Sequence, residues 1–177
     1  MAIERALPHY NYNDYETWEG AWELIQGVPF AMTPSPTLEH QRISKKIALQ
    51  LETSLSDCKQ CEALFAIDWK IDEHTVVEPD NLVTCHEEQG NYLSMAPDLI
   101  FEILSPSTED RDRQIKFDLY QKEGVLYYCL VDPVERVAKI FKLHQGSYIK
   151  DADVSTETHA FDLQKCRIEL DFSLIWP

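Results

Sequence analysis

A glutamate lies in the middle of one of the most hydrophobic runs of the chain, Asp98-Leu-Ile-Phe-Glu102-Ile-Leu104. The length of this run and its β-branched and aromatic content predict a buried central strand. An ionised carboxylate is seldom placed in such a strand, because burying it without a partner costs several kcal/mol even after relaxation. The rest of the chain must therefore supply a partner for Glu102.

Two kinds of partner are available. Asp80 lies in a second strand-like run, residues 76–83, and Lys116 lies on the helix expected to follow Glu102. Two acids on adjacent strands with a nearby lysine predict a hydrolytic site for a divalent metal, since Mg²⁺ is usually held by one or two carboxylates together with the phosphate of a substrate. The lysine would orient or deprotonate the attacking water and offset charge on a phosphate oxygen.

Each of these residues also has a simpler interpretation. Glu102 could form a salt bridge with a core arginine or lie at a frayed strand end. Asp80 stands in Glu-Pro-Asp-Asn, which is also a turn signature. Lys116 could form a surface pair with Asp112, four residues earlier on the same helical face.

Bulk properties restrict the class of protein. At 177 residues, with 44% hydrophobic content, we expect a single globular domain. No run reaches the ~18 apolar residues of a membrane span, and the N-terminus lacks a signal pattern, so we expect a cytoplasmic protein. Five cysteines, an odd number, favour reduced thiols over a disulfide framework. The net charge of −15 argues against tight non-specific binding of nucleic acid.

Hydrophobic periodicity and capping residues predict a mixed α/β fold. The helical stripe of Ile43, Ile47, Leu51 and Leu55 is especially regular. Expected helices span about residues 13–20, 38–54 and 108–123, the last capped by Ser107 or Thr108 and ended by Gly124. Expected strands span about residues 22–26, 28–32, 62–71, 76–84, 99–104, 125–131 and 136–143, with one or two more between residues 148 and 176.

Several segments of the chain resemble the Uma-two family of proposed restriction endonucleases, within the PD-(D/E)XK nuclease superfamily. The resemblance covers roughly residues 15–143, and its most specific part is Glu102-Ile-Leu-Ser-Pro-Ser-Thr108 with the lysine helix behind it. The matching segments are Glu23-Leu-Ile-Gln-Gly27, His40, Asp68, Pro79-Asp80, Pro97 to Thr108, Asp112-x-x-x-Lys116-x-x-x-Tyr120 and Tyr128-Cys-Leu-Val-Asp132-Pro133.

This resemblance implies a restriction-endonuclease-like fold, with a central mixed β-sheet flanked by helices and a C-terminal strand extension over residues 144–177. It implies a catalytic site made of Glu23, Asp80, Glu102 and Lys116, in which the three acids bind Mg²⁺ or Mn²⁺. The implied activity is cleavage of phosphodiester bonds in DNA, and we expect a homodimer. Glu23 could instead be an ordinary polar strand residue.

The chain departs from the superfamily pattern in two places. Leu104 stands where a lysine is expected two residues after the glutamate, so Lys116 would be a relocated lysine. Gln26 and Val28 stand where the family usually has acids. The missing acids and the acidic net charge of −15 favour a rival interpretation, in which the chain is a catalytically inactive binding module and the same residues form a structural ion-pair network.

A zinc site is a further alternative. Cys58-Lys-Gln-Cys61 has the spacing of zinc ligands, and Cys85-His86 could complete a set of four. Small buried thiols are the commoner reason for such cysteines. His40, at a helix start, is a candidate for the periphery of the nuclease site.

Overall fold

The computed structural model describes residues 8–32, 35–106 and 108–177. Its centre is β7 (Leu99–Ile103), the strand that carries Glu102, and all five residues of this strand are buried. It belongs to a six-stranded sheet in the order β10-β9-β8-β7-β6-β3. The other strands are β3 (Glu62–Phe65), β6 (Asn81–Thr84), β8 (Tyr127–Asp132), β9 (Val137–His144) and β10 (Ser147–Val154).

This sheet is mixed, as predicted. Strands β7 and β8 are parallel, and every other neighbouring pair in it is antiparallel. A parallel pair needs a crossover connection, and the chain between β7 and β8 supplies it as a helix. Because side chains alternate along β7, the sheet separates two hydrophobic clusters, one on each face.

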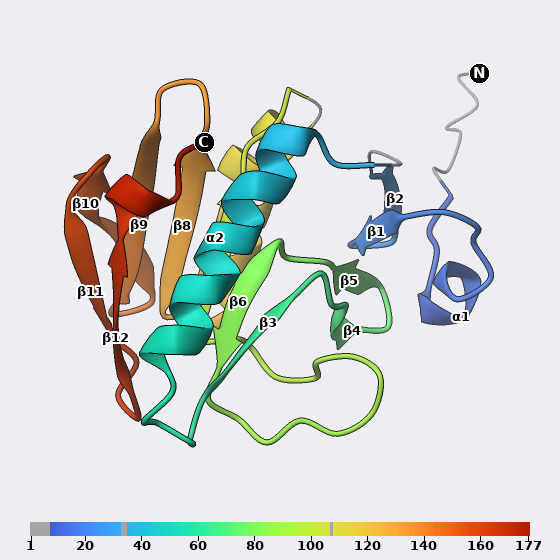
Figure 1. The fold of residues 1–177 in the computed structure, drawn as a ribbon. Helices are drawn as coiled ribbons and strands as arrows, with labels where there is room; N and C mark the ends of the chain where they lie inside the picture. The colour runs from blue at the N-terminus through green and yellow to red at the C-terminus, as the bar shows by residue number, and fades with distance from the viewer. Residues whose placement is uncertain (1–7, 33–34, 107) are drawn as a thin grey trace.

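One face is covered by helix α2 (Leu38–Ser54), which has the bounds that its periodicity predicts. Ile43, Ile47 and Leu51 are buried against the sheet. Beside α2 lies a C-terminal hairpin, and Figure 1 shows both in front of the large sheet. The hairpin consists of β11 (Thr158–Asp162) and β12 (Arg167–Asp171), followed by the short helix η2 (Phe172–Leu174). The tail therefore holds more regular structure than the one or two strands expected.

The opposite face carries a π-helical turn, η1 (Arg111–Ile115), which continues into α3 (Lys116–Glu123) and ends at Gly124 with a φ of 86°. Leu119 and Tyr120 are buried there. Ile115, at the end of this turn, is 40% exposed, because the wide π-helical turn changes which residues face the sheet. Ser107, one of the expected caps, lies outside the described residues.

A second, four-stranded sheet in the order β2-β1-β5-β4 adjoins this face. Its N-terminal hairpin is close to prediction, with left-handed backbone at Gln26 and Gly27 in the turn. The preceding helix is shorter than expected and is capped by Asn11. The elements are α1 (Tyr12–Tyr15), β1 (Trp22–Ile25), β2 (Val28–Ala31), β4 (Trp69–Asp72) and β5 (Thr75–Val77).

Two expected strands were each wrong in the same way. The runs at residues 62–71 and 76–84 are both broken in the middle, so that each contributes one strand to each sheet. The first break contains Ala66 with a φ of 49°, and the second contains Pro79, which has no N–H to donate to a ladder. Asp80 therefore lies at the junction between the two sheets.

The expectation of reduced cysteines was also wrong for this structure. It contains the disulfides Cys58–Cys166 and Cys61–Cys85, and Cys129 is a buried free thiol. The pairs join positions 108 and 24 residues apart. Only the folded topology brings them together, so spacing along the chain does not show the pairing.

No helix in the described part of the chain is both long and apolar enough to cross a lipid bilayer.

Candidate functional site

The ammonium group of Lys116 joins two of the predicted acids. Lys116 Nζ lies 2.8 Å from Glu23 Oε1 and 2.8 Å from Glu102 Oε1. It also lies 3.6 Å from Asp112 Oδ1, so the i,i+4 pair exists as well. All four side chains are buried, with Lys116 only 2% exposed. The Asp112–Lys116 pair is therefore part of a buried cluster and does not lie on the surface.

Four separate elements supply this cluster. Glu23 comes from β1 of the small sheet, Glu102 from β7 of the large sheet, and Asp112 from η1. Lys116 opens α3 directly after the π-helical turn. Turns of this kind are frequent at functional sites, and here the turn precedes the lysine that faces both sheets.

Backbone hydrogen bonds fix the acids from the side of the sheet junction. Glu78 N donates to Glu23 Oε1 at 2.9 Å, and Ile103 N donates to Asp80 Oδ2 at 2.7 Å. The second bond places the Asp80 carboxylate beside the residue that follows Glu102. The break between β5 and β6 makes this possible, because it frees Asp80 from the ladder of either sheet.

His40 completes the outer edge of the site. His40 Nε2 lies 3.1 Å from Asp80 Oδ1, and the two side chains are 17% and 20% exposed. The family position of His40 at the start of α2 therefore corresponds to a direct contact with a predicted metal ligand. These two residues form the solvent-facing part of the site.

Three members of the cluster were not among the predicted catalytic residues. Tyr120 donates its hydroxyl to Glu102 Oε1 at 2.7 Å, and Arg111 Nε lies 3.3 Å from Glu23 Oε2. Asp112 is the third. The spacing Asp112, Lys116, Tyr120 already places three of the cluster residues on one helical face, and that periodicity is the signal for Asp112 and Tyr120. Arg111 has no such signal, because its direction depends on the π-helical turn.

The electrostatics of the cluster show an excess of negative charge. Burial raises the pKa of Glu102 well above its ordinary value, and the Lys116 ammonium offsets this only in part, since neighbouring acids repel a further charge. Burial also raises the pKa of Asp112. For Lys116, burial lowers the pKa, but the surrounding carboxylates outweigh it and hold the pKa well above its ordinary value. Lys116 is therefore charged, and it lies beside three carboxyl groups, those of Glu23, Glu102 and Asp112. Arg111 supplies a second positive charge, beside Glu23.

A divalent cation fits this set of residues by chemistry. Glu23 Oε2 and Asp112 Oδ1 are buried and have no hydrogen-bond partner, and each has only an ion-pair contact, with Arg111 Nε at 3.3 Å and Lys116 Nζ at 3.6 Å. Hard cations prefer carboxylate oxygens. The carboxylate oxygens are not, however, arranged as ligands around one point. In the described ranges of the chain, no three of these acids have oxygens that all lie within 4.8 Å of one another. Lys116 holds the position between Glu23 and Glu102, so a cation would have to be accompanied by a shift of its ammonium.

The His40–Asp80 pair leads to a prediction on pH. Burial by itself lowers the pKa of His40, but the hydrogen bond and charge of Asp80 outweigh it, so the pKa lies above its ordinary value. A raised pKa in the folded state means that the pair adds stability below about pH 6.5 and loses it as the pH rises through the folded-state value. His40→Gln should therefore lower the free energy of unfolding by up to about 1 kcal/mol in mild acid and by much less at alkaline pH.

Urea denaturation at several pH values checks this result. The exposed His144, at the end of β9, provides the matched control, and His144→Gln should show no such trend. A His40→Gln deficit that is equal at all pH values would contradict the prediction.

Comparison with known proteins agrees with the fold. The chain matches the model of the Uma2 family, described as "Putative restriction endonuclease", over residues 11–168. The chain belongs to this family. The resemblance drawn from the Glu102 and Lys116 segments is thereby confirmed, and the Uma2 match extends past residue 143 into the C-terminal hairpin.

The structure is also similar to a crystal structure described as "a putative nuclease belonging to DUF820" from Anabaena variabilis ATCC 29413. The TM-score is 0.75 at 18% sequence identity, covering 94% of this chain and 97% of that chain. At this identity the likeness shows the fold, and it confirms the mixed α/β architecture. No curated protein matches this Uma2 chain significantly.

Proposed function

We propose that this protein is a Mg²⁺- or Mn²⁺-dependent endonuclease that hydrolyses phosphodiester bonds in DNA. The main support is the buried contact of one lysine with two acids from different sheets, Lys116 with Glu23 and Glu102, in a chain of the Uma2 family. Asp80, Glu102 and Glu23 are the proposed metal ligands, and Lys116 is the proposed catalytic lysine.

A bound divalent cation would polarise the phosphoryl group and lower the pKa of a water molecule. The protein supplies the remaining functions. Lys116, freed from one of its carboxylates, is placed to hold the attacking water and to neutralise charge on a phosphate oxygen. Tyr120 and the backbone N–H of Ile103 hold Glu102 and Asp80 in orientation through their hydrogen bonds.

The substrate would approach from the side of Asp80 and His40, since these side chains retain partial exposure while Lys116 and Glu23 do not.

The rival function, a binding module with a structural ion-pair network, has its own support. The cluster is closed around Lys116, and its acids are not gathered as metal ligands. Buried ion pairs of this kind persist in proteins without catalysis. The two functions differ in one measurable property, which is the binding of a divalent cation.

Calorimetric titration with Mn²⁺ separates them. We expect saturable binding to the oxidised protein, in which the paired cysteines do not compete for metal, together with Mn²⁺-dependent cleavage of plasmid DNA. Asp80→Ala should abolish both. Asp153→Ala, which removes an exposed acid paired with Lys150 on β10, is the matched control and should change neither. Absence of Mn²⁺ binding to the native protein would support the rival.

The homodimer and the cytoplasmic location remain predictions. Light scattering of the purified chain tests the first, and fractionation of cells that produce it tests the second.

A further inference from the structure

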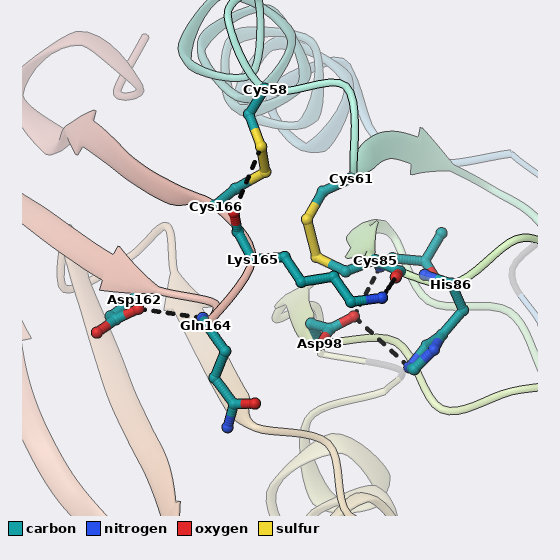
Figure 2. Close-up of a disulfide and its surroundings, with 10 residues drawn as sticks. Cys58, Cys61, Cys85, His86, Asp98, Asp162, Gln164, Lys165 and Cys166 are labelled. Carbon is teal, nitrogen blue, oxygen red and sulfur yellow. Dashed lines mark hydrogen bonds and ion pairs between the residues drawn. A yellow bond between two sulfur atoms is a disulfide. The ribbon is translucent and has the colours of Figure 1, made fainter.

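Four cysteines from three segments of the chain meet at one corner of the fold (Figure 2). Cys58 and Cys61 lie in the turn that leads from α2 to β3, Cys85 follows β6, and Cys166 lies in the turn between β11 and β12. They form two neighbouring disulfides, Cys58–Cys166 and Cys61–Cys85. The corner thus joins the large sheet, the helix that covers it and the C-terminal hairpin.

The two disulfides are close enough to be one site. The sulfur atoms of Cys58, Cys61 and Cys166 all lie within 4.8 Å of one another, and the sulfur of Cys85 is bonded to that of Cys61. A tetrahedral zinc ion with Zn–S bonds of about 2.3 Å sets its four sulfurs about 3.8 Å apart. Rotation of the cysteine side chains would therefore bring four free thiols to this spacing. The Cα atoms of the two pairs are 6.0 and 4.0 Å apart.

We propose that, when the two disulfides are reduced, these four cysteines bind one Zn²⁺ ion. Two equivalents of a dithiol reductant, each oxidised to its own disulfide, supply the four electrons and four protons that convert two protein disulfides into four thiols. Zinc then displaces up to four protons and is held by four thiolates. The same corner of the fold is thus closed by sulfur–sulfur bonds in an oxidising environment and by a metal in a reducing one.

The surroundings favour this set over the one that includes His86. The imidazole of His86 points toward Asp98, with Nε2 3.9 Å from Asp98 Oδ2. Cys166, 81 residues after Cys85, is the fourth proposed ligand instead. It could not be recognised as a partner of the Cys58-x-x-Cys61 motif before the fold was known.

Charge near the corner is also suitable. Lys165 Nζ donates to Cys85 O at 2.6 Å, so an ammonium lies beside the cysteines. Four thiolates around Zn²⁺ carry a net charge of about −2, and a nearby cation offsets part of it. Asp98 accepts the backbone N–H of Cys85 at 2.7 Å and holds that residue in position.

Cobalt substitution tests the proposal. The chain is reduced with a phosphine under argon, freed of metal, and titrated with Co²⁺. We expect a thiolate-to-cobalt charge-transfer band and the strong visible bands of a tetrahedral four-sulfur site, saturating at one ion per chain and lost on addition of Zn²⁺. The reduced chain should retain one zinc ion after desalting. The oxidised chain should bind no zinc at these cysteines, because their sulfurs are bonded in pairs.

Variants show which residues bind the metal. Cys166→Ser should remove the four-sulfur spectrum and weaken zinc binding by more than about 100-fold, since even outer-shell changes cost 10- to 100-fold. Cys129→Ala, which removes the buried fifth cysteine on β8, is the matched control and should leave the spectrum unchanged. His86→Ala should leave it unchanged as well.

Two results would overturn the proposal. One is a folded, reduced chain with no cobalt–thiolate band. The other is a reduced chain that unfolds even with Zn²⁺ present, because a site of this kind stabilises the folded state. Neither result bears on the proposed nuclease, which is measured on the oxidised chain with Mn²⁺.

Discussion

Replacing Lys116 with methionine should abolish DNA cleavage and lower the free energy of unfolding by about 3–5 kcal/mol at neutral pH. Methionine keeps much of the length of the side chain but removes the ammonium that lies 2.8 Å from both Glu23 and Glu102. The two buried carboxylates then lose the ammonium that they share, and only Glu23 keeps a cation, the Arg111 guanidinium 3.3 Å from its Oε2. Loss of a proton-transfer group of this kind should reduce the rate of cleavage by at least about 100-fold. Urea denaturation and a plasmid-nicking assay measure the two effects.

The destabilisation should depend on pH in a definite direction. Burial raises the pKa of Glu102 in the folded state, and removal of the ammonium raises it further. When the pKa of a carboxyl group is raised in the folded state, the free energy of unfolding of the protein falls as the pH rises from the unfolded-state pKa, about 4.3, toward the folded-state pKa. The deficit of Lys116→Met should therefore shrink in acid. Lys150→Met, on an exposed lysine paired with Asp153, should cost less than about 1 kcal/mol at every pH. A Lys116→Met protein as stable as the native one at neutral pH would show that the cluster is not a buried ion pair.

The double variant Cys58→Ser, Cys166→Ser should lose about 4 kcal/mol of stability in the oxidised state. The disulfide between these residues closes a loop of 108 positions, and the entropy removed from the unfolded chain grows with loop length. The comparison uses urea denaturation in oxidising buffer with a chelator present, so that no metal contributes.

The control for this experiment is the reduced state. With a reductant and the chelator, the double variant and the native chain should differ by less than about 1 kcal/mol, since neither then has the cross-link. Equal stability of the two proteins in oxidising buffer would mean that the Cys58–Cys166 bond does not constrain the unfolded chain as expected.

The central part of the fold could be predicted because local pattern and tertiary environment agree there. The apolar run around Glu102 predicted a buried strand, and all five residues of β7 are buried in the structure. The four-residue spacing of Asp112, Lys116 and Tyr120 placed these side chains on one helical face, and the structure shows that this face meets Glu102. A buried charge in a strand requires a partner, and this requirement correctly identified Lys116 as a partner of Glu102.

Other features depend on backbone geometry that hydrophobic pattern does not encode. The run at residues 62–71 is continuous in pattern, yet it changes sheets at Ala66, which has a positive φ. The contact of Arg111 with Glu23 depends on the π-helical turn, which shifts the helical register. The cysteine pairs likewise depend on contacts between distant segments.

The position of Glu23 has a consequence for how this site is interpreted in other chains. Glu23 is carried by the small sheet, whereas Glu102 and Lys116 belong to the large sheet and its helix. Lys116 therefore also links the two sheets through its ion pairs with Glu23 and Glu102. The same three residues can therefore join the two sheets in a homologue whether or not that homologue hydrolyses DNA, so cation binding and cleavage have to be measured in each chain.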